Sequence, residues 1–176
     1  MEFEQKIIDL ARQIKLVIFD VDGVLTDGGL YFTDDGREIK KFNVKDGLGI
    51  SILVKKGIEV AVITGRNSVI VAERMKSLGV NHVYQGRMNK LETYENLKMA
   101  LQITDEQVAF IGDDIIDLPI MKHCGLSVAV ADAHDEVIKQ AGLVLSKRGG
   151  DGAARQLCDL IMYSQGITHD FSDSKQ

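Results

Sequence analysis

Short apolar runs alternate with amphipathic stretches along most of this chain. The apolar runs are continuous, without the polar alternation of half-exposed strands, which is typical of parallel strands buried on both faces. They predict six strands, at residues 15–19, 58–63, 83–84, 108–111, 127–130 and 143–145. Strands that alternate with amphipathic helices are typical of βαβ units. We therefore expect an α/β fold, Rossmann-like and doubly wound, with a mainly parallel sheet.

The amphipathic stretches predict the helices of this fold, because their apolar residues recur at helical spacing. The expected helices span residues 46–56, 68–78, 90–101, 118–124, 135–141 and 152–163, and a further helix before the first strand carries Ile7, Leu10, Ala11 and Ile14 on one face. The sequence from Thr104 to Gln107 is a capping box and predicts a short helical turn before the fourth strand.

One segment after the first strand departs from this pattern. Residues 30–33 and 37–42 flank an Asp-Asp-Gly sequence at 34–36, which is favoured in hairpin turns. We predict a β-hairpin here, a flap that spans about residues 28–43. This hairpin and one helix fill the chain between Asp20 and Thr64, and one helix and one strand fill it between Thr64 and Lys90, which leaves no room for a separate cap domain.

The composition is that of one globular domain. The chain has 176 residues, of which 45% are hydrophobic and 27% charged. We expect a single domain over residues 1–165, and a disordered tail over the polar residues 166–176. The net charge of -5 and the lack of Lys/Arg runs argue against nucleic acid or an anionic membrane as a partner. A charged start and the absence of long apolar runs predict a cytoplasmic protein.

Polar residues suited to catalysis or metal binding follow the predicted strands, at the edge where parallel sheets bind ligands. Asp20 and Asp22 flank the end of the first strand, and Gly23 permits a sharp turn. Taken alone, this pair is also compatible with an ordinary acidic loop. Thr64 and Gly65 follow the second strand and could approach an anion closely.

Two further positions belong to the same edge of the predicted sheet. Lys90 opens a helix, where a lone lysine is usually a surface residue. Asp113, Asp114 and Asp117 follow the fourth strand, and three carboxylates so close repel one another unless a cation lies between them. Capping of the next helix by Asp114 accounts for only one of the three.

The ordered combination of these groups resembles the haloacid dehalogenase superfamily of phosphotransferases. The resemblance implies that Asp20 is the nucleophile of an aspartyl-phosphate and that Asp22 is the general acid and base. It implies a Mg²⁺ ion held by Asp20, the carbonyl of Asp22 and Asp113, with Asp114 and Asp117 beside these ligands. Thr64 and Lys90 would neutralise the phosphoryl oxygens.

Long phrases of the sequence, over roughly residues 5–165, are similar to the capless 3-deoxy-D-manno-octulosonate 8-phosphate (KDO 8-phosphate) phosphatases of lipopolysaccharide biosynthesis. They include residues 20–28, 42–47, 84–86, 112–117, 127–134 and 149–155. The resemblance implies hydrolysis of a phosphorylated sugar acid, with substrate contacts at Asp22, Asn43, Val44, Lys45, Asp46, Gly47, Ser51, Gly65, Arg66, Arg74 and Lys90. We also expect Asp46 to cap the helix that follows it, which leaves free amides near Gly47 for an anion.

The mode of assembly follows from the missing cap. The phosphoryl site still needs shielding from water, and an isolated hairpin is marginally stable. We therefore expect the flap, with Tyr31 and Phe32, to pack against another subunit, and the resemblance implies a homotetramer. The alternative is a flap folded onto its own domain.

Two alternative functions stay open at this point. One is a related capless phosphatase that acts on a nine-carbon sugar-acid phosphate. The other belongs to a different class, a phosphoaspartate receiver-like signalling module, although the chain order of its acidic groups differs from the order here.

Overall fold

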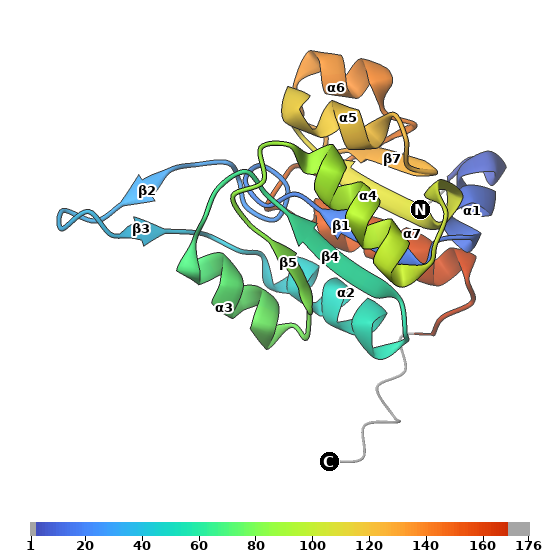
Figure 1. Cartoon of the computed structure of the whole chain (residues 1–176), viewed down its shortest axis with the longest axis horizontal. Coiled ribbons are helices and arrows are strands. Elements are labelled where there is room, and N and C mark those ends of the chain that lie inside the picture. Colours follow the sequence, from blue (N-terminus) through green and yellow to red (C-terminus); the bar gives the residue numbers. More distant parts are fainter. Residues whose placement is uncertain (1–2, 169–176) are drawn as a thin grey trace, which may run out of the picture.

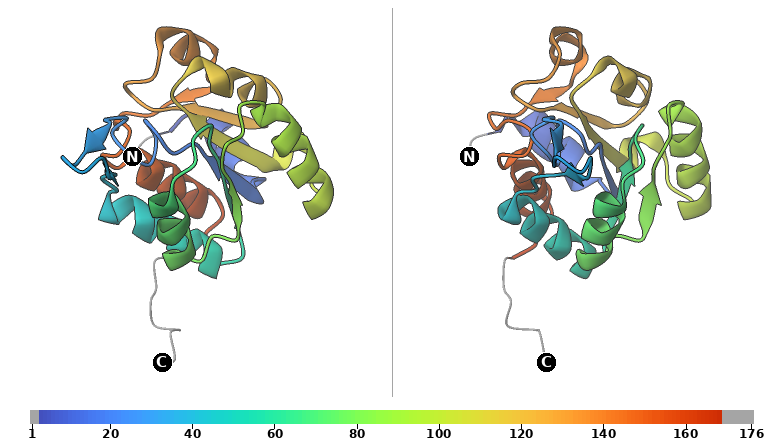
Figure 2. Two further views of the ribbon diagram at one scale, coloured as in Figure 1. Left: turned by 60° about the vertical axis from the view of Figure 1, so that its left-hand side comes forward. Right: turned by 90° about the vertical axis from the view of Figure 1, so that its left-hand side faces the viewer.

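The computed structural model describes residues 3–168 and has a six-stranded parallel sheet between two layers of helices (Figures 1 and 2). The strand order is β5-β4-β1-β6-β7-β8, and every neighbouring pair is parallel. The strands are β1 (Leu16–Phe19), β4 (Glu59–Ile63), β5 (His82–Tyr84), β6 (Val108–Gly112), β7 (Leu126–Ala129) and β8 (Leu143–Val144). The expected fold class and all six expected strands are confirmed.

The strand order contains a topological switch at β1. The chain first adds β4 and β5 on one side of β1, and then returns to add β6, β7 and β8 on the other side. β1 is therefore hydrogen-bonded to both β4 and β6. The loops that leave β4, β1 and β6 meet at one edge of the sheet, where ligands bind in open α/β folds.

The helices cover both faces of this sheet. They are α1 (Gln5–Arg12), α2 (Val44–Lys55), α3 (Val69–Ser77), α4 (Lys90–Leu101), α5 (Leu118–Met121), α6 (Asp135–Gln140) and α7 (Ala153–Ser164). Helix α7 packs against α1 and α2 on one face, and α5 packs against α4 and α6 on the other (Figure 2). The capping box at Thr104 is present and starts a 3-10 turn, Asp105–Gln107. No helix within residues 3–168 combines the length and hydrophobicity of a membrane span.

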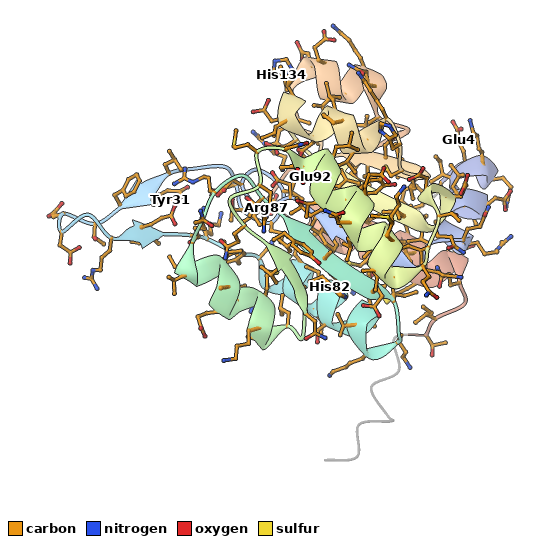
Figure 3. All side chains as sticks on the ribbon, in the orientation of Figure 1. Glu4, Tyr31, His82, Arg87, Glu92 and His134 are labelled. Atoms are coloured by element: carbon orange, nitrogen blue, oxygen red, sulfur yellow. The ribbon has the colours of Figure 1, made fainter. Side chains whose placement is uncertain are left out.

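The hairpin extends from the body of the domain as β2 (Tyr31–Phe32) and β3 (Glu38–Ile39) (Figure 1). Its strands are antiparallel as expected but only two residues long each. Gly36 has a φ of 80° in the turn, a conformation that suits glycine. Large apolar side chains on the hairpin are exposed, with Leu30 at 56% and Phe32 at 59%. Figure 3 shows Tyr31 on this extension, beyond the sheet and its helices.

The expectation that Asp46 caps its own helix is wrong. Helix α2 begins at Val44, and the side chain of Asn43 accepts a hydrogen bond from the Lys45 amide as its N-cap. The Asp46 carboxylate instead accepts hydrogen bonds from the amides of Gly152 (3.3 Å) and Arg155 (2.7 Å) at the start of α7. Its burial raises the pKa of Asp46, although these two hydrogen bonds oppose that shift. A buried carboxylate thus joins the N-terminus of α7 to α2.

The expected tail at 166–176 falls mostly outside the described residues, which end at Thr168. Ile167 is described and packs against the core, and its amide donates to the Met162 carbonyl at 2.9 Å. The chain therefore stays attached to the domain up to Ile167, two residues beyond the C-cap of α7, Gln165.

Replacement of Asp46 should destabilise the fold. Asp46→Ala leaves amides of α7 without their acceptor, which typically costs about 1–2 kcal/mol for a lost cap. For a chain of this size, that loss lowers the Tm by about 2–8 °C. Thermal unfolding followed by circular dichroism measures the effect. Asp151→Ala, which removes an exposed carboxylate beside the same helix, is the control and should leave the Tm within about 1 °C. Equal Tm values for both variants would contradict this role of Asp46.

Candidate active site

The polar residues expected at strand ends lie at one edge of the sheet. Asp20 follows β1, Thr64 follows β4 and Asp113 follows β6, and these three strands are neighbours. The Asp20 amide continues the ladder by donating to the Ile111 carbonyl at 3.1 Å. Asp20 and Thr64 are buried, at 6% and 2% exposure. The sheet order thus brings together residues that are up to 93 positions apart (113 − 20).

Lys90 is the first residue of α4 and points into this edge. Its Nζ donates to Asp20 Oδ1 at 2.8 Å and to Asp117 Oδ1 at 2.7 Å, and its side chain is 1% exposed. Burial alone would lower the pKa of Lys90, but the two carboxylates outweigh it and raise that pKa. Lys90 is therefore a buried ammonium ion, not the surface lysine that its position alone suggests.

Carboxylates outnumber cations in this cluster. One oxygen from each of Asp20, Asp113 and Asp117 lies within 4.8 Å of the others. Burial raises the pKa of Asp20 to about 6, although Lys90 opposes this shift. Burial, together with the charges of Asp20 and Asp117, raises the pKa of Asp113 to about 8. Both shifts arise in a cluster where one lysine faces three carboxylates.

The geometry of the cluster fits a divalent cation. Asp117 uses both oxygens, because Oδ1 accepts from Lys90 while Oδ2 accepts from the amides of Asp113 (3.0 Å) and Asp114 (3.3 Å). Within the described residues, Asp113 Oδ1 is buried without a hydrogen-bond partner. Such an oxygen is costly unless a cation or donor binds it. Oxygen ligands of this kind suit Mg²⁺, with Asp20 and Asp113 as the available donors.

Asp114 and Asp117 differ in burial and in their hydrogen bonds, although the resemblance implied that both lie beside the metal ligands. Asp114 is exposed and caps the next turn by accepting from the Ile115 amide at 2.7 Å. Asp117 is fully buried and holds both Lys90 and the loop of Asp113.

Glycines let the surrounding loops approach these carboxylates. A Cβ atom on Gly23 would lie 2.0 Å from Asp113 Oδ2, and Gly23 also has a φ of 91°. A Cβ atom on Gly149 would lie 1.7 Å from the Gly23 carbonyl oxygen. A 2.9 Å hydrogen bond from the Gly150 amide to the Val24 carbonyl also joins the loop before α7 to the loop that follows β1. Larger residues at 23 or 149 would push the two loops apart.

Asp22 lies at the rim of the site, with a side chain that is 24% exposed. Its Oδ1 forms an ion pair with Lys40, the residue that follows β3 of the hairpin. Sequence analysis missed Lys40 and its neighbour Glu38. Their spacing could have indicated that the two side chains lie close together, because residues two apart on an extended chain share a face.

The expected substrate-contact residues do not all gather at the carboxylates. Gly65 lies near Met88 and Ile116 at the mouth of the site, and Arg66 Nη2 donates to Glu38 Oε1 at 2.9 Å. Arg74 instead packs against Gly47, and both line a separate cavity of about 10 Å³ together with Asn43 and Asp46. Val44 and Lys45 are exposed in the first turn of α2, and Ser51 is half-buried further along it.

Known proteins share both the sequence and the structure of this chain. Residues 79–157 match the family model for haloacid dehalogenase-like hydrolases. The 3-deoxy-D-manno-octulosonate 8-phosphate phosphatase KdsC of Escherichia coli K12 is 49% identical over 160 residues, which cover 91% of this chain and 85% of the relative.

Solved structures agree with this similarity. The Yersinia pestis 3-deoxy-D-manno-octulosonate 8-phosphate phosphatase has a TM-score of 0.91 and 48% identity, with 93% of this chain and 88% of that chain covered. The Moraxella catarrhalis phosphatase, solved with magnesium, phosphate and KDO, has a TM-score of 0.91 and 38% identity, with 93% and 94% covered. This chain belongs to the family of 3-deoxy-D-manno-octulosonate 8-phosphate phosphatases within the haloacid dehalogenase-like hydrolases.

Proposed function

We propose that this protein is a Mg²⁺-dependent phosphatase that hydrolyses KDO 8-phosphate to KDO and inorganic phosphate. The main support is the buried Asp20 carboxylate, which is bound by Lys90 and lies beside Asp113. One oxygen of Asp113 is buried without a hydrogen-bond partner in the part of the chain that the structure describes. This arrangement suits attack on a phosphoryl group. The sugar-acid substrate is inferred from membership of the family. A receiver-like signalling module is not supported, because the relatives are phosphatases over nearly the whole chain.

The proposed reaction has two steps, both centred on Asp20. A carboxylate oxygen of Asp20 attacks the phosphorus, the bond from phosphorus to the sugar oxygen breaks, and Asp22 gives a proton to that oxygen. Water then attacks the aspartyl-phosphate and loses a proton to Asp22, which releases inorganic phosphate and regenerates Asp20. Asp20 and Asp113, with the Asp22 carbonyl, would hold Mg²⁺, which when bound supplies positive charge at the phosphoryl oxygens.

Two further residues stabilise the transferred group in this proposal. Lys90 places an ammonium ion 2.8 Å from Asp20 and is held there by Asp117. Thr64 lies at the end of the neighbouring strand, and its hydroxyl could donate to a phosphoryl oxygen. Groups fixed before the reaction stabilise developing charge without the cost of reorganisation.

The remaining residues expected to contact the sugar acid fall into two groups. Gly65 and Arg66 belong to the same chain as the clustered carboxylates and lie at the rim of their site, where the Arg66 side chain is 45% exposed. Arg74, Asn43 and Gly47 lie in a different cavity, which none of the clustered carboxylates lines. We propose that this second group, with Val44, Lys45 and Ser51, serves the site of a neighbouring subunit. The Asp46 side chain supports that surface through its bonds to α7.

The flap carries the exposed apolar surface that we propose for contact between subunits. Leu30, Phe32 and Ile39 are each at least half exposed on a hairpin that extends beyond the domain. Their exposure costs about 25 cal/mol per Å² of apolar area. We propose a domain over residues 1–165 that forms a homo-oligomer, a tetramer by family resemblance, through this flap.

Asp20→Asn should abolish turnover of KDO 8-phosphate. An amide is no nucleophile, so we expect a loss of at least roughly 10⁴-fold, the scale seen when a covalent nucleophile is removed. Release of inorganic phosphate measures the rate. Mass spectrometry of acid-quenched wild type should show one added phosphoryl group on the peptide that contains Asp20. Substantial turnover by the folded variant would contradict the covalent mechanism. A nine-carbon sugar-acid phosphate, assayed in parallel, decides between the two substrates.

Removal of the metal should abolish activity reversibly. We expect EDTA to stop phosphate release and excess Mg²⁺ to restore it, and Mg²⁺ should raise the Tm of the wild type because a ligand of the folded state stabilises it. Asp113→Ala removes a proposed ligand and should abolish that Tm increase. Asp135→Ala, which removes an exposed carboxylate at the start of α6, is the control and should retain it. Full activity in the metal-free enzyme would contradict this assignment.

Polar substitutions on the flap should weaken assembly. Leu30→Ser combined with Phe32→Ser removes apolar area that we expect to be buried between subunits. Light scattering should show a smaller particle, and the KM for KDO 8-phosphate should rise as the shared site opens. Met99→Ser, at an equally exposed apolar residue of α4, should change neither quantity. A wild-type monomer with full activity would refute assembly through the flap.

A further inference from the structure

Lys40 is a charged residue with a buried side chain, and the proposed mechanism assigns it no role. It follows β3 at the base of the hairpin, and its side chain is only 2% exposed. A lysine is rarely so buried unless its charge is paired. Its Nζ forms an ion pair with Asp22 Oδ1 and lies 3.5 Å from Glu38 Oε1. The ammonium group therefore lies between the hairpin and the loop that follows β1.

Glu38 fixes the position from which Lys40 reaches Asp22. Glu38 Oε1 accepts from Arg66 Nη2 at 2.9 Å, and Oε2 accepts from Ser68 Oγ at 2.9 Å. Both donors belong to the segment that follows β4. Glu38 and Lys40 share one face of the strand, so the base of the hairpin is bonded to two loops of the site at once.

The consequence concerns the orientation of Asp22. This side chain is partly exposed, and its ion pair with Lys40 is the one bond of its carboxylate found among the described residues. A free carboxylate would sample several rotamers, whereas proton transfer requires hydrogen-bond distance to the leaving oxygen. A charge-assisted bond from a buried ammonium ion holds the side chain in one orientation.

We propose that Lys40 is a positioning residue that holds Asp22 for proton transfer, so that the flap contributes to catalysis within its own subunit. This inference rests on the proposed function, in which Asp22 is the general acid and base. Two other roles are possible for a buried lysine here. It could bind the substrate phosphate directly, or it could only anchor the hairpin.

The leaving group distinguishes these three roles. A sugar alkoxide needs a proton from Asp22, whereas p-nitrophenolate leaves without one. The kcat/KM reports the steps up to departure of the leaving group. Loss of positioning should therefore lower kcat/KM for a sugar phosphate much more than for p-nitrophenyl phosphate. Loss of phosphate binding would lower both alike, and loss of an anchor would lower both together with the Tm.

The test compares Lys40→Met with Lys41→Met in the full-length chain. Lys41 is the next residue, its side chain is 68% exposed, and its Nζ lies 3.6 Å from Asp27, so its replacement makes the same charge change outside the site. We expect Lys40→Met to lower kcat/KM for KDO 8-phosphate by about 10–100-fold, part of the 10²–10⁴-fold that acid–base catalysis supplies. The value for p-nitrophenyl phosphate should fall by less than about 3-fold, and Lys41→Met should change neither. Lys40→Gln guards against misfolding of the Met variant and should give the same pattern.

A double-mutant cycle with Asp22→Asn completes the experiment. If Lys40 acts through Asp22, adding Lys40→Met to Asp22→Asn should cost less than about 3-fold for KDO 8-phosphate. Equal losses for both substrates, or a full additional loss in the double variant, would overturn the proposal while leaving the phosphatase function intact. A wild type that hydrolyses no sugar phosphate would refute the proposed function and the role of Lys40 together.

Discussion

One buried lysine faces three carboxylates at the carboxyl edge of the sheet, and the rest of the site depends on this interaction. Buried charges are costly unless they are paired, yet among the described residues Lys90 forms ion pairs with Asp20 and Asp117 alone. The helix that carries Lys90 is the connection that returns from β5 to β6, across the switch at β1. The same topology that orders the strands thus brings the ammonium group of Lys90 to Asp20. Asp113 has a buried oxygen without a partner among the described residues, and this oxygen is the reason why this edge suits a divalent metal.

Close approach of backbone loops is the second constraint. Gly23 lies against the Asp113 carboxylate, and Gly149 lies against Gly23, at distances that no side chain at either position would allow. The loop before α7 therefore supports the loop that carries Asp20 and Asp22. Asp46 extends this support, because it bonds the first turn of α7 to α2. Contacts made by α2 and α7 thereby help to fix the position of the loop that carries Asp20 and Asp22.

The sequence predicted the fold correctly where the pattern of apolar residues reflects burial. The strands β1, β4 and β6 were predictable because their residues are almost all buried, and the residues of the site were predictable because most of them follow those strands. Most element ends differed by at most two residues, but the helix expected at 118–124 ends three residues earlier, at Met121. Hydrogen bonds and not burial decide where a helix begins and ends. Asp46 was misassigned because a local cap was expected, whereas its actual partners are more than 100 residues away. Lys40 was missed for a related reason: its spacing from Glu38 indicates only that the two side chains share a face, whereas its pairing with Asp22 depends on how the hairpin leaves the domain.

The hairpin carries two chemically different sets of side chains, and this difference bears on how a phosphatase without a cap domain controls its site. Leu30 and Phe32, at the first strand, are apolar and exposed. Glu38 and Lys40, at the second strand, are charged and bonded to the loops after β1 and β4. Phe32 is paired directly with Glu38 across the two strands. Because a short two-stranded hairpin is marginally stable by itself, contacts of the apolar side chains also determine how firmly the charged ones are held. If the apolar side chains dock against a neighbour as proposed, assembly and the orientation of Asp22 become coupled through this one pair of strands. Such coupling would give a small domain a closed and ordered site only in the oligomer, the state in which the residues around Arg74 can complete it.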